Sequence, residues 1–273
     1  MENLIRAHFA RLWRAPVFWL GTAASAAAGV LLWFPNAAGL AVLPPICCAA
    51  VFSLFFGAEH ADGTMRNKLA AGHSREAIYL ATLIAALAVM GLYLALSSPG
   101  IFLTARLYPS GRYTPGQGVL AVVTVVLSSV SVAAAQICLC MLVHRRAVLA
   151  LGLVFLTLGG IMTASAVNDE LQAYAGYWTV EYVPTAPAPG ELPIESYGVT
   201  DEGPTLERNV YVPPEKPPAA LSFFVHVLPA AQVFRAVDPE RFFVTWSMPL
   251  CSLAETGLVT ALGLALFKRK DIK

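Results

Sequence analysis

The residues best suited to chemistry gather in one polar stretch, residues 59–80, which lies between two apolar runs. Its ionisable side chains are Glu59, His60, Asp62, Arg66, Lys68, His73, Arg75 and Glu76. One further carboxylate, Glu255, lies inside an apolar run near the C-terminus. A carboxylate at membrane depth is costly and usually faces a bundle interior or a wet cavity. Glu255 therefore lines a substrate path, accepts hydrogen bonds from facing helices, or lies close enough to the outer interface to reach water.

Sequence motifs that bind nucleotides or metals are missing. There is no GxxxxGK[ST] phosphate loop, no HExxH, no CxxC pair and no GxSxG turn. The histidines are scattered, so they give no metal-ligand spacing. All five cysteines fall within apolar runs, where buried thiols are expected rather than disulfides; they are Cys47, Cys48, Cys138, Cys140 and Cys251. We expect no catalytic residue, metal or cofactor in this chain.

The composition indicates a membrane protein. Hydrophobic residues make up 57% of the 273 and charged residues only 13%, whereas soluble domains have about 25% charged residues. Roughly 20 apolar residues cross a bilayer core. Six predicted spans follow from this: Val17–Phe34, Val42–Gly57, Ala77–Leu103, Val119–Val143, Ala147–Val167 and Met248–Phe267. The second contains Pro44 and Pro45, so we expect its outer end to be irregular or shielded by protein.

Residues 1–16 predict an amphipathic helix at the membrane interface that Pro16 separates from the first span. The alternative is a signal peptide, because basic residues precede an apolar run. With the N-terminus in the cytosol, alternating spans collect arginine and lysine in the inner segments and acidic residues in the outer ones. The positive-inside rule then places both termini in the cytosol.

The segment 168–247 is predicted to be a large outer loop. Its middle is rich in proline, which excludes regular helix there. Two patches, Tyr177–Tyr182 and Asn209–Val212, are predicted to pair as strands. Leu221–Val237 is apolar but too short to span, which favours a helix or re-entrant piece, the alternative being a packed core segment of the loop.

Three patches carry a family resemblance. The first is Glu59, Gly63-Thr64, Arg66-Asn67-Lys68-Leu69, Gly72, Ser74-Arg75 and Ile78-Tyr79-Leu80. The second is the C-terminal Phe267 to Lys273, and the third is Leu228-Pro229 with Gln232. These patches resemble ABC-2-type exporter permeases, above all the short permeases common in Gram-positive bacteria. The third resembles their LPxGQ element, in which Ala231 here replaces the glycine.

The resemblance implies an all-α transmembrane half-transporter of six helices with an N-terminal interfacial elbow helix. Two halves pair, as two copies or with a sister permease, and each docks on a separate ATP-binding subunit that holds ATP and Mg²⁺. The loop after the second span supplies the coupling helix. The residues carried over to this coupling role are Glu59, Gly63, Thr64, Arg66, Asn67, Lys68, Gly72, Ser74 and Arg75.

The residues themselves fit a short helix. Met65 to Ala71 can be helical after Gly63-Thr64, and Gly72 can end the helix. Asn67 and Ser74 can bond backbone groups at its ends. We expect Glu59 to pair with Arg66, Arg75 or an N-terminal arginine and so to lock the loop to the elbow helix. The alternative is that Arg66, Lys68 and Arg75 only enforce topology and touch anionic lipid.

The predicted organisation has four parts. Residues 1–16 form the interfacial helix, 17–167 hold five spans with the coupling segment 59–76, 168–247 form the extracellular loop, and 248–273 form the sixth span and a basic tail. The predicted function is that of a non-enzymatic exporter subunit in the bacterial plasma membrane, whose partners are the ATP-binding subunit, another permease and lipid, but no nucleic acid. Glu255 is a candidate for the translocation path. The alternative function is a sensor or scaffold whose outer loop binds a ligand.

Overall fold

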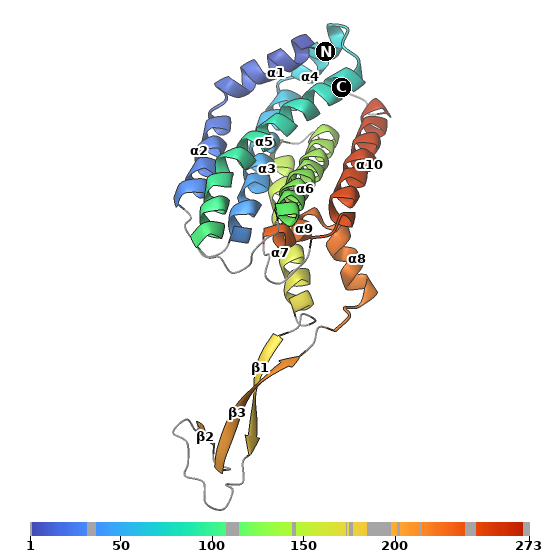
Figure 1. The fold of residues 1–273 in the computed structure, drawn as a ribbon. Helices are drawn as coiled ribbons and strands as arrows, with labels where there is room; N and C mark the ends of the chain where they lie inside the picture. Colours follow the sequence, from blue (N-terminus) through green and yellow to red (C-terminus); the bar gives the residue numbers. More distant parts are fainter. Residues whose placement is uncertain are drawn as a thin grey trace, which may run out of the picture.

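The computed structural model describes residues 2–31, 37–107, 115–143, 146–172, 174, 177–184, 198–200, 203–212, 215–237 and 244–269. The elements in order are α1 (Glu2–Arg14), α2 (Pro16–Leu31), α3 (Ala37–Ala61), α4 (Thr64–Ala70), α5 (Arg75–Leu107), α6 (Pro115–Leu142), α7 (Arg146–Gln172), β1 (Tyr177–Pro184), β2 (Gly198–Thr200), β3 (Gly203–Val212), α8 (Ala219–Val227), α9 (Pro229–Val237) and α10 (Ser247–Arg269). The long helices form a bundle from which the strands project at one end (Figure 1).

Several helices are long and apolar enough to cross a membrane. Within the described residues these are Leu43–His60, Arg75–Pro99, Gly116–Leu142, Ala150–Leu171 and Ser247–Arg269. They match five of the six predicted spans, so the chain has several helices that are long and apolar enough to span a membrane, as expected of a membrane protein. The other predicted span falls on α2, which is described over 16 residues, and the end of that span lies outside the described residues. The six-span layout stays a prediction.

The amphipathic N-terminal helix is found as α1. Leu4, His8 and Leu12 recur at four-residue spacing and are buried against the bundle. Phe9 and Trp13 lie on another face and are exposed. The helix stops before Pro16, where α2 begins, because proline lacks the N–H that would continue the helix. One face of α1 thus packs on protein, and a second offers aromatic side chains to an interface.

The prolines of the second predicted span do not make it irregular. Pro44 and Pro45 lie inside α3, which is helical from Ala37 to Ala61, and both are buried. The alternative in that prediction, shielding by protein, is therefore the one observed. The shielding includes a hydrogen bond at 3.0 Å from Gln136 Nε2 on α6 to the carbonyl of Pro45, which supplies a donor at membrane depth.

The two ends of the bundle carry different elements. The α4 end, as we call it, carries α1, α4 and the last residues of α10, whereas α8 and the strands lie at the opposite end (Figure 1). The core beneath the α4 end contains large buried side chains of α3 and α5, with a cluster that includes Phe52, Phe56, Tyr79 and Met90. The first residues of α1 and the last residues of α10 both lie at the α4 end (Figure 1).

The segment between α7 and α8 contains a small sheet. β1 and β3 pair antiparallel with Tyr177 opposite Val212 and Val180 opposite Asn209, and β2 adds to β3. The predicted pairing of the two patches is thereby confirmed. The segment starts later than predicted, because α7 continues to Gln172. Residues 185–197 of the proline-rich middle and 270–273 of the basic tail lie outside the described residues.

The segment predicted as a helix or re-entrant piece is a bent helix pair. α8 and α9 are separated at Leu228 and meet at 92°. Pro229 opens α9, at the first helical position, where its missing N–H costs no hydrogen bond. The bend therefore turns α9 back onto the bundle helices, where it packs against α6, α7 and α3.

Close packing of α2 on α5 predicts the effect of a glycine substitution. A Cβ at Gly21 would meet the ring and hydroxyl of Tyr93, whose hydroxyl donates to the carbonyl of Phe18 at 3.0 Å. We expect Gly21→Ala to lower the stability by about 1–3 kcal/mol through overpacking, measured as thermal unfolding in detergent. Gly91→Ala is the control, because a Cβ there meets no atom within 4 Å; equal losses in the two variants would contradict the packing.

Candidate functional site

The polar stretch contains the short helix expected from its sequence. α4 runs from Thr64 to Ala70 between Gly63 (φ +67°) and Gly72 (φ +86°), both in the left-handed region that glycine adopts without strain. At its C-terminus the N–H of Gly72 donates to Leu69 O at 2.9 Å and the N–H of His73 donates to Lys68 O at 3.2 Å. These two bonds form a Schellman motif. Glycine at both ends thus fixes the length of α4.

A buried carboxylate at the end of α3 ties α4 to α1. Glu59 has no exposed surface, and it accepts from Arg11 Nη1 at 2.6 Å and from Lys68 Nζ at 2.8 Å. Arg11 comes from α1 and Lys68 from α4, so one side chain joins three elements. We call Glu59, Arg11, Lys68 and His8 the Glu59 cluster. The expectation that Glu59 locks the loop to an N-terminal arginine is met by Arg11.

His8 occupies the interior of this cluster as a neutral side chain. Its Nε2 lies 3.3 Å from Lys68 Nζ and 3.4 Å from Thr82 Oγ1, and its Nδ1 lies 3.6 Å from Glu59 Oε1. The ammonium of Lys68 can only donate, so Nε2 is the acceptor and the proton is assigned to Nδ1. Burial lowers the pKa of His8 to about 4, with Lys68 and Arg11 acting in the same direction and Glu59 opposing them.

Lys68 is the second cation, beside Arg11, that pairs with the Glu59 carboxylate. Burial lowers the pKa of Lys68, and the neighbouring Glu59 carboxylate opposes that shift. A buried carboxylate without its cations would keep an uncompensated charge in a medium of low dielectric. α4 is further held by Met65, which is buried in the core. Packing and charge therefore fix α4 from the same side.

A second set of contacts ties the start of α5 to the end of α10. Arg75 Nη1 donates to the carbonyl of Lys268 at 2.9 Å and weakly to that of Phe267 at 3.4 Å. Glu76 forms an ion pair with Lys268 across the same junction. A guanidinium at a helix C-terminus also complements the negative end of the helix dipole. The α4 end therefore connects α10 to the polar stretch as well.

The structure separates the predicted site residues into two groups. Glu59 and Lys68 are brought together, and Gly63 and Gly72 bound the helix next to them. Arg66 and Arg75, which were predicted as possible partners of Glu59, do not contact it; Arg66 is exposed and Arg75 turns to α10. Ser74 accepts from the N–H of Ala77 at 3.2 Å and so caps α5, not α4.

The remaining residues predicted to couple to an ATPase are exposed or half-buried. Arg66 and Asn67 are exposed, and Thr64 and Gly63 are half-buried. Asn67 forms no side-chain hydrogen bond within the described residues, so the expectation that it bonds a helix end is not met. Because α4 is anchored through Met65 and Lys68, its opposite face presents Arg66 and Asn67 outward. The coupling role of these residues stays a prediction.

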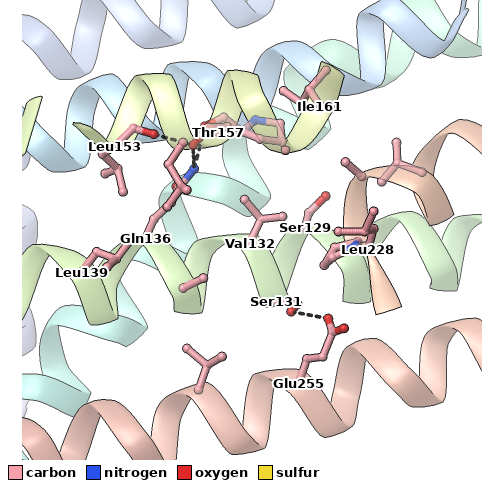
Figure 2. Close-up of a pocket in the computed structure, with 18 of the residues that line it drawn as sticks. Ser129, Ser131, Val132, Gln136, Leu139, Leu153, Thr157, Ile161, Leu228 and Glu255 are labelled. Carbon is pink, nitrogen blue, oxygen red and sulfur yellow. Dashed lines mark hydrogen bonds between the residues drawn. The ribbon is translucent and has the colours of Figure 1, made fainter. Parts of the chain in front are cut away.

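Glu255 lies apart from the Glu59 cluster, on α10 beside a cavity. Its Oε2 accepts from Ser131 Oγ on α6 at 3.0 Å (Figure 2). The cavity of about 390 Å³ lies between α6, α7, α9 and α10. This placement agrees with a carboxylate that hydrogen-bonds to a facing helix at the edge of a bundle cavity.

Several polar residues near this cavity were not singled out from the sequence. Gln232 accepts from Ser128 at 2.9 Å and from Ser252 at 2.8 Å, and donates to His226 O at 2.6 Å. These bonds hold α9 between α6 and α10. The serines carry no sequence signal, since serine is common in apolar helices, whereas Gln232 belongs to the third resembling patch. His8 had a signal, its four-residue spacing from Leu4 and Leu12.

No protein-family model, no curated protein and no solved structure matches this chain. Its function is therefore argued from its own residues and their geometry. Two features carry that argument. One is α4, which the Glu59 cluster holds at one end of the bundle, and the other is the cavity beside Glu255.

Removing the Glu59 carboxylate should release α4. We expect Glu59→Ala to lower the stability by on the order of 3 kcal/mol, because Lys68 keeps its charge in a buried site without its partner. Thermal unfolding in detergent gives the stability, and hydrogen exchange gives the opening of the α4 amides. Glu76→Ala is the matched control; it breaks an exposed ion pair with Lys268 that should be worth about 0–1 kcal/mol. Equal effects of the two substitutions would exclude the clamp.

The neutral His8 makes stability depend on pH. The unfolded state takes up a proton near the ordinary pKa of 6.5, whereas the folded state resists protonation down to about 4. Stability should therefore be complete above pH 6.5 and fall on acidification towards pH 4, by on the order of 2 kcal/mol. Melting temperatures in detergent from pH 7 to 4.5 measure this loss. His8→Gln, which cannot titrate, should flatten the curve; an unchanged slope would rule out His8 as its source.

Proposed function

We propose that this chain is the membrane-spanning permease subunit of an ATP-driven ABC exporter, with α4 as its coupling helix. The observation that carries the proposal is the Glu59 cluster, which clamps α4 to α1 and α3 while Arg66 and Asn67 face outward. A permease without its own phosphate loop needs a rigid element on which a separate ATPase can push. A loop that served only topology would need no such clamp.

The contacts of the α4 end support transmission of a push into the bundle. Force on α4 reaches α3 and α1 through Lys68, Glu59 and Arg11. The turn after α4 leads directly into α5, whose Arg75 bonds the carbonyls at the end of α10. Displacement of α4 would therefore move the ends of four helices together. This is the mechanical requirement of alternating access driven from one side.

The proposal takes α2 as the sixth span and places the α4 end in the cytosol. The arginines and lysines of α1, α4 and the end of α10 then lie inside, as the positive-inside rule requires. ATP and Mg²⁺ belong to the partner subunit in this assembly, and a second copy or a sister permease completes the pathway. The cell membrane of a bacterium is the proposed location.

A second candidate function is a sensor or scaffold in the membrane. The observation in its favour is the antiparallel pair of β1 and β3, which projects beyond the bundle (Figure 1) and could meet an external partner. This candidate gives no reason for the Glu59 cluster. An ATPase partner separates the two candidates, because only the exporter requires one.

The test is association with an ATPase. The tagged chain, purified in mild detergent from its native cells, should retain a subunit with a GxxxxGK[ST] loop, and its presence should change that subunit's rate of ATP hydrolysis. We expect Arg66→Glu to weaken this association about tenfold or more, because it reverses an exposed charge on α4. Arg6→Glu is the matched control, since Arg6 is exposed on α1 and pairs only locally with Glu2.

Two outcomes would contradict the proposal. One is purification of the chain without any ATPase, together with an unchanged rate of ATP hydrolysis when candidate ATPases are added. The other is equal weakening by Arg66→Glu and Arg6→Glu, which would show a general charge effect at this end instead of recognition of α4. Both variants should keep the wild-type melting temperature, because neither side chain is buried.

A further inference from the structure

The cavity beside Glu255 combines an apolar wall with one carboxylate. Its volume is about 390 Å³, within the range of small-molecule sites, about 300–1,000 Å³. Most of the wall is aliphatic, with Leu139, Leu153, Leu156, Ile161 and Val259 among its residues. Figure 2 shows α6 crossing the view between α7 and α10, with Gln136 directed to α7 and Glu255 reaching α6 from α10.

Glu255 has no cation of its own. Ser131 donates to one carboxylate oxygen, and within the described residues no lysine, arginine or histidine forms an ion pair with Glu255. This contrasts with Glu59, which is held by two cations. A carboxylate in an apolar wall is strongly stabilised only by a positive charge or by further hydrogen-bond donors. The carboxylate of Glu255 therefore has unused capacity to bind a cation.

Two further polar atoms of the wall lack partners. Ser129 Oγ and Gln136 Oε1 are buried without a hydrogen bond, and both residues line the cavity. The orientation of the Gln136 amide is fixed, because its Nε2 donates to Pro45 O at 3.0 Å and to Thr157 Oγ1 at 3.2 Å. Thr157 Oγ1 itself donates to Leu153 O, so it must accept from Gln136. Gln136 Oε1 is thus left as an acceptor without a donor.

We propose that this cavity binds an amphipathic amine, a molecule with a protonated, hydrogen-bond-donating amine on an apolar body. The ammonium pairs with Glu255, donors on the ligand reach the unpaired atoms of Gln136 and Ser129, and the body packs on the aliphatic wall. Binding itself is independent of the permease function. Only the statement that this amine is the exported substrate rests on the function proposed above.

Other ligand classes fit the same walls less well. An anion would meet the charge of Glu255. Among the described residues that line the cavity, the hydroxyl groups are those of Ser129, Ser131 and Thr157, and the last two already donate to Glu255 and to Leu153 O. A neutral hydrocarbon would fill the volume but leave the carboxylate and Gln136 Oε1 without donors, and an unpaired buried polar group is costly. A hydrogen-bond-donating cation is the class that supplies both a charge and the missing donors.

The test uses a fluorescent amine on the purified full chain in lipid nanodiscs. The probe is dansylcadaverine, a primary amine on an aromatic body, and its N-acetyl derivative is the neutral comparison. We expect the amine to bind saturably and the acetylated form to bind at least about tenfold more weakly, because it lacks the charge-assisted hydrogen bond. Glu255→Gln should weaken binding of the amine by a similar factor and leave the acetylated form unchanged.

Matched variants control for folding and for partition into lipid. Gly160 lines the cavity and Gly159 does not, yet a Cβ at either position meets no atom within 4 Å. Gly160→Leu should therefore abolish saturable binding and Gly159→Leu should retain it. Glu170→Gln removes an exposed carboxylate of α7 and should bind as the wild type does. Melting temperatures of all variants show that each remains folded.

Two results would overturn the proposal. One is equal affinity for the amine and its acetylated form in the wild type. The other is binding that Glu255→Gln and Gly160→Leu leave unchanged. If nanodiscs containing phosphatidylethanolamine displace the probe, the bound amine is a lipid headgroup; if they do not, it is a free amphiphile, and either result supports the site.

The outcome can be separated from that of the permease proposal. A chain that binds the amine but recruits no ATPase keeps this site and loses the exporter function. A chain that recruits an ATPase but fails to bind the amine keeps the exporter function and loses this site. If the amine site and the exporter function are both correct, the probe should also change the rate of ATP hydrolysis in the assembled complex. Glu255→Gln should then remove that change.

Discussion

The buried carboxylate of Glu59 is the interaction on which the α4 end depends. A charge with no exposed surface at the end of a membrane helix is tolerated only beside cations, and here the cations come from two other elements, Arg11 on α1 and Lys68 on α4. The position of α3 therefore dictates where both of these helices lie. His8 fits between the charged side chains because it stays neutral. The cluster therefore contains two cations, Arg11 and Lys68, and one anion, Glu59, and His8 adds no third positive charge.

The membrane-depth polar groups fall into two kinds. The side-chain amide of Gln232 has hydrogen-bond partners in two serines and a backbone carbonyl. These hydrogen bonds hold α6, α9 and α10 together. Gln136 and Glu255 line the cavity; Gln136 Oε1 has no hydrogen-bond donor, and Glu255 accepts from Ser131 through one carboxylate oxygen. Since unsatisfied polar atoms are disfavoured in proteins, the proposed amine would supply Gln136 and Glu255 with the partners that Gln232 already has.

Local signals in the sequence were enough for local structure. The glycines at 63 and 72 predicted α4 because positive φ at its ends is a property of the residues themselves, and the strand patches at Tyr177 and Asn209 predicted their own pairing. The partner of Glu59 could not be predicted in the same way. Arg66, Arg75 and three N-terminal arginines were available, and the choice of Arg11 depends on how α1 packs across 48 residues of sequence. The choice between an irregular end and a shielded one for the two prolines in α3 was open for the same reason, since the donor that reaches the carbonyl of Pro45 comes from α6.

Two helices run from the α4 end to the cavity. α3 carries Glu59 at one end and, 14 residues earlier, the Pro45 carbonyl that binds Gln136; at about 1.5 Å per residue this is roughly 21 Å. α10 carries Glu255, and 12 residues later its Phe267 carbonyl bonds Arg75, roughly 18 Å away. In the proposed permease, a push that shifts either helix along its axis would change the contact of Gln136 with Pro45 or that of Ser131 with Glu255. Helices are stiff along their axes, so these two contacts are where coupling between ATPase and cargo would have to be measured.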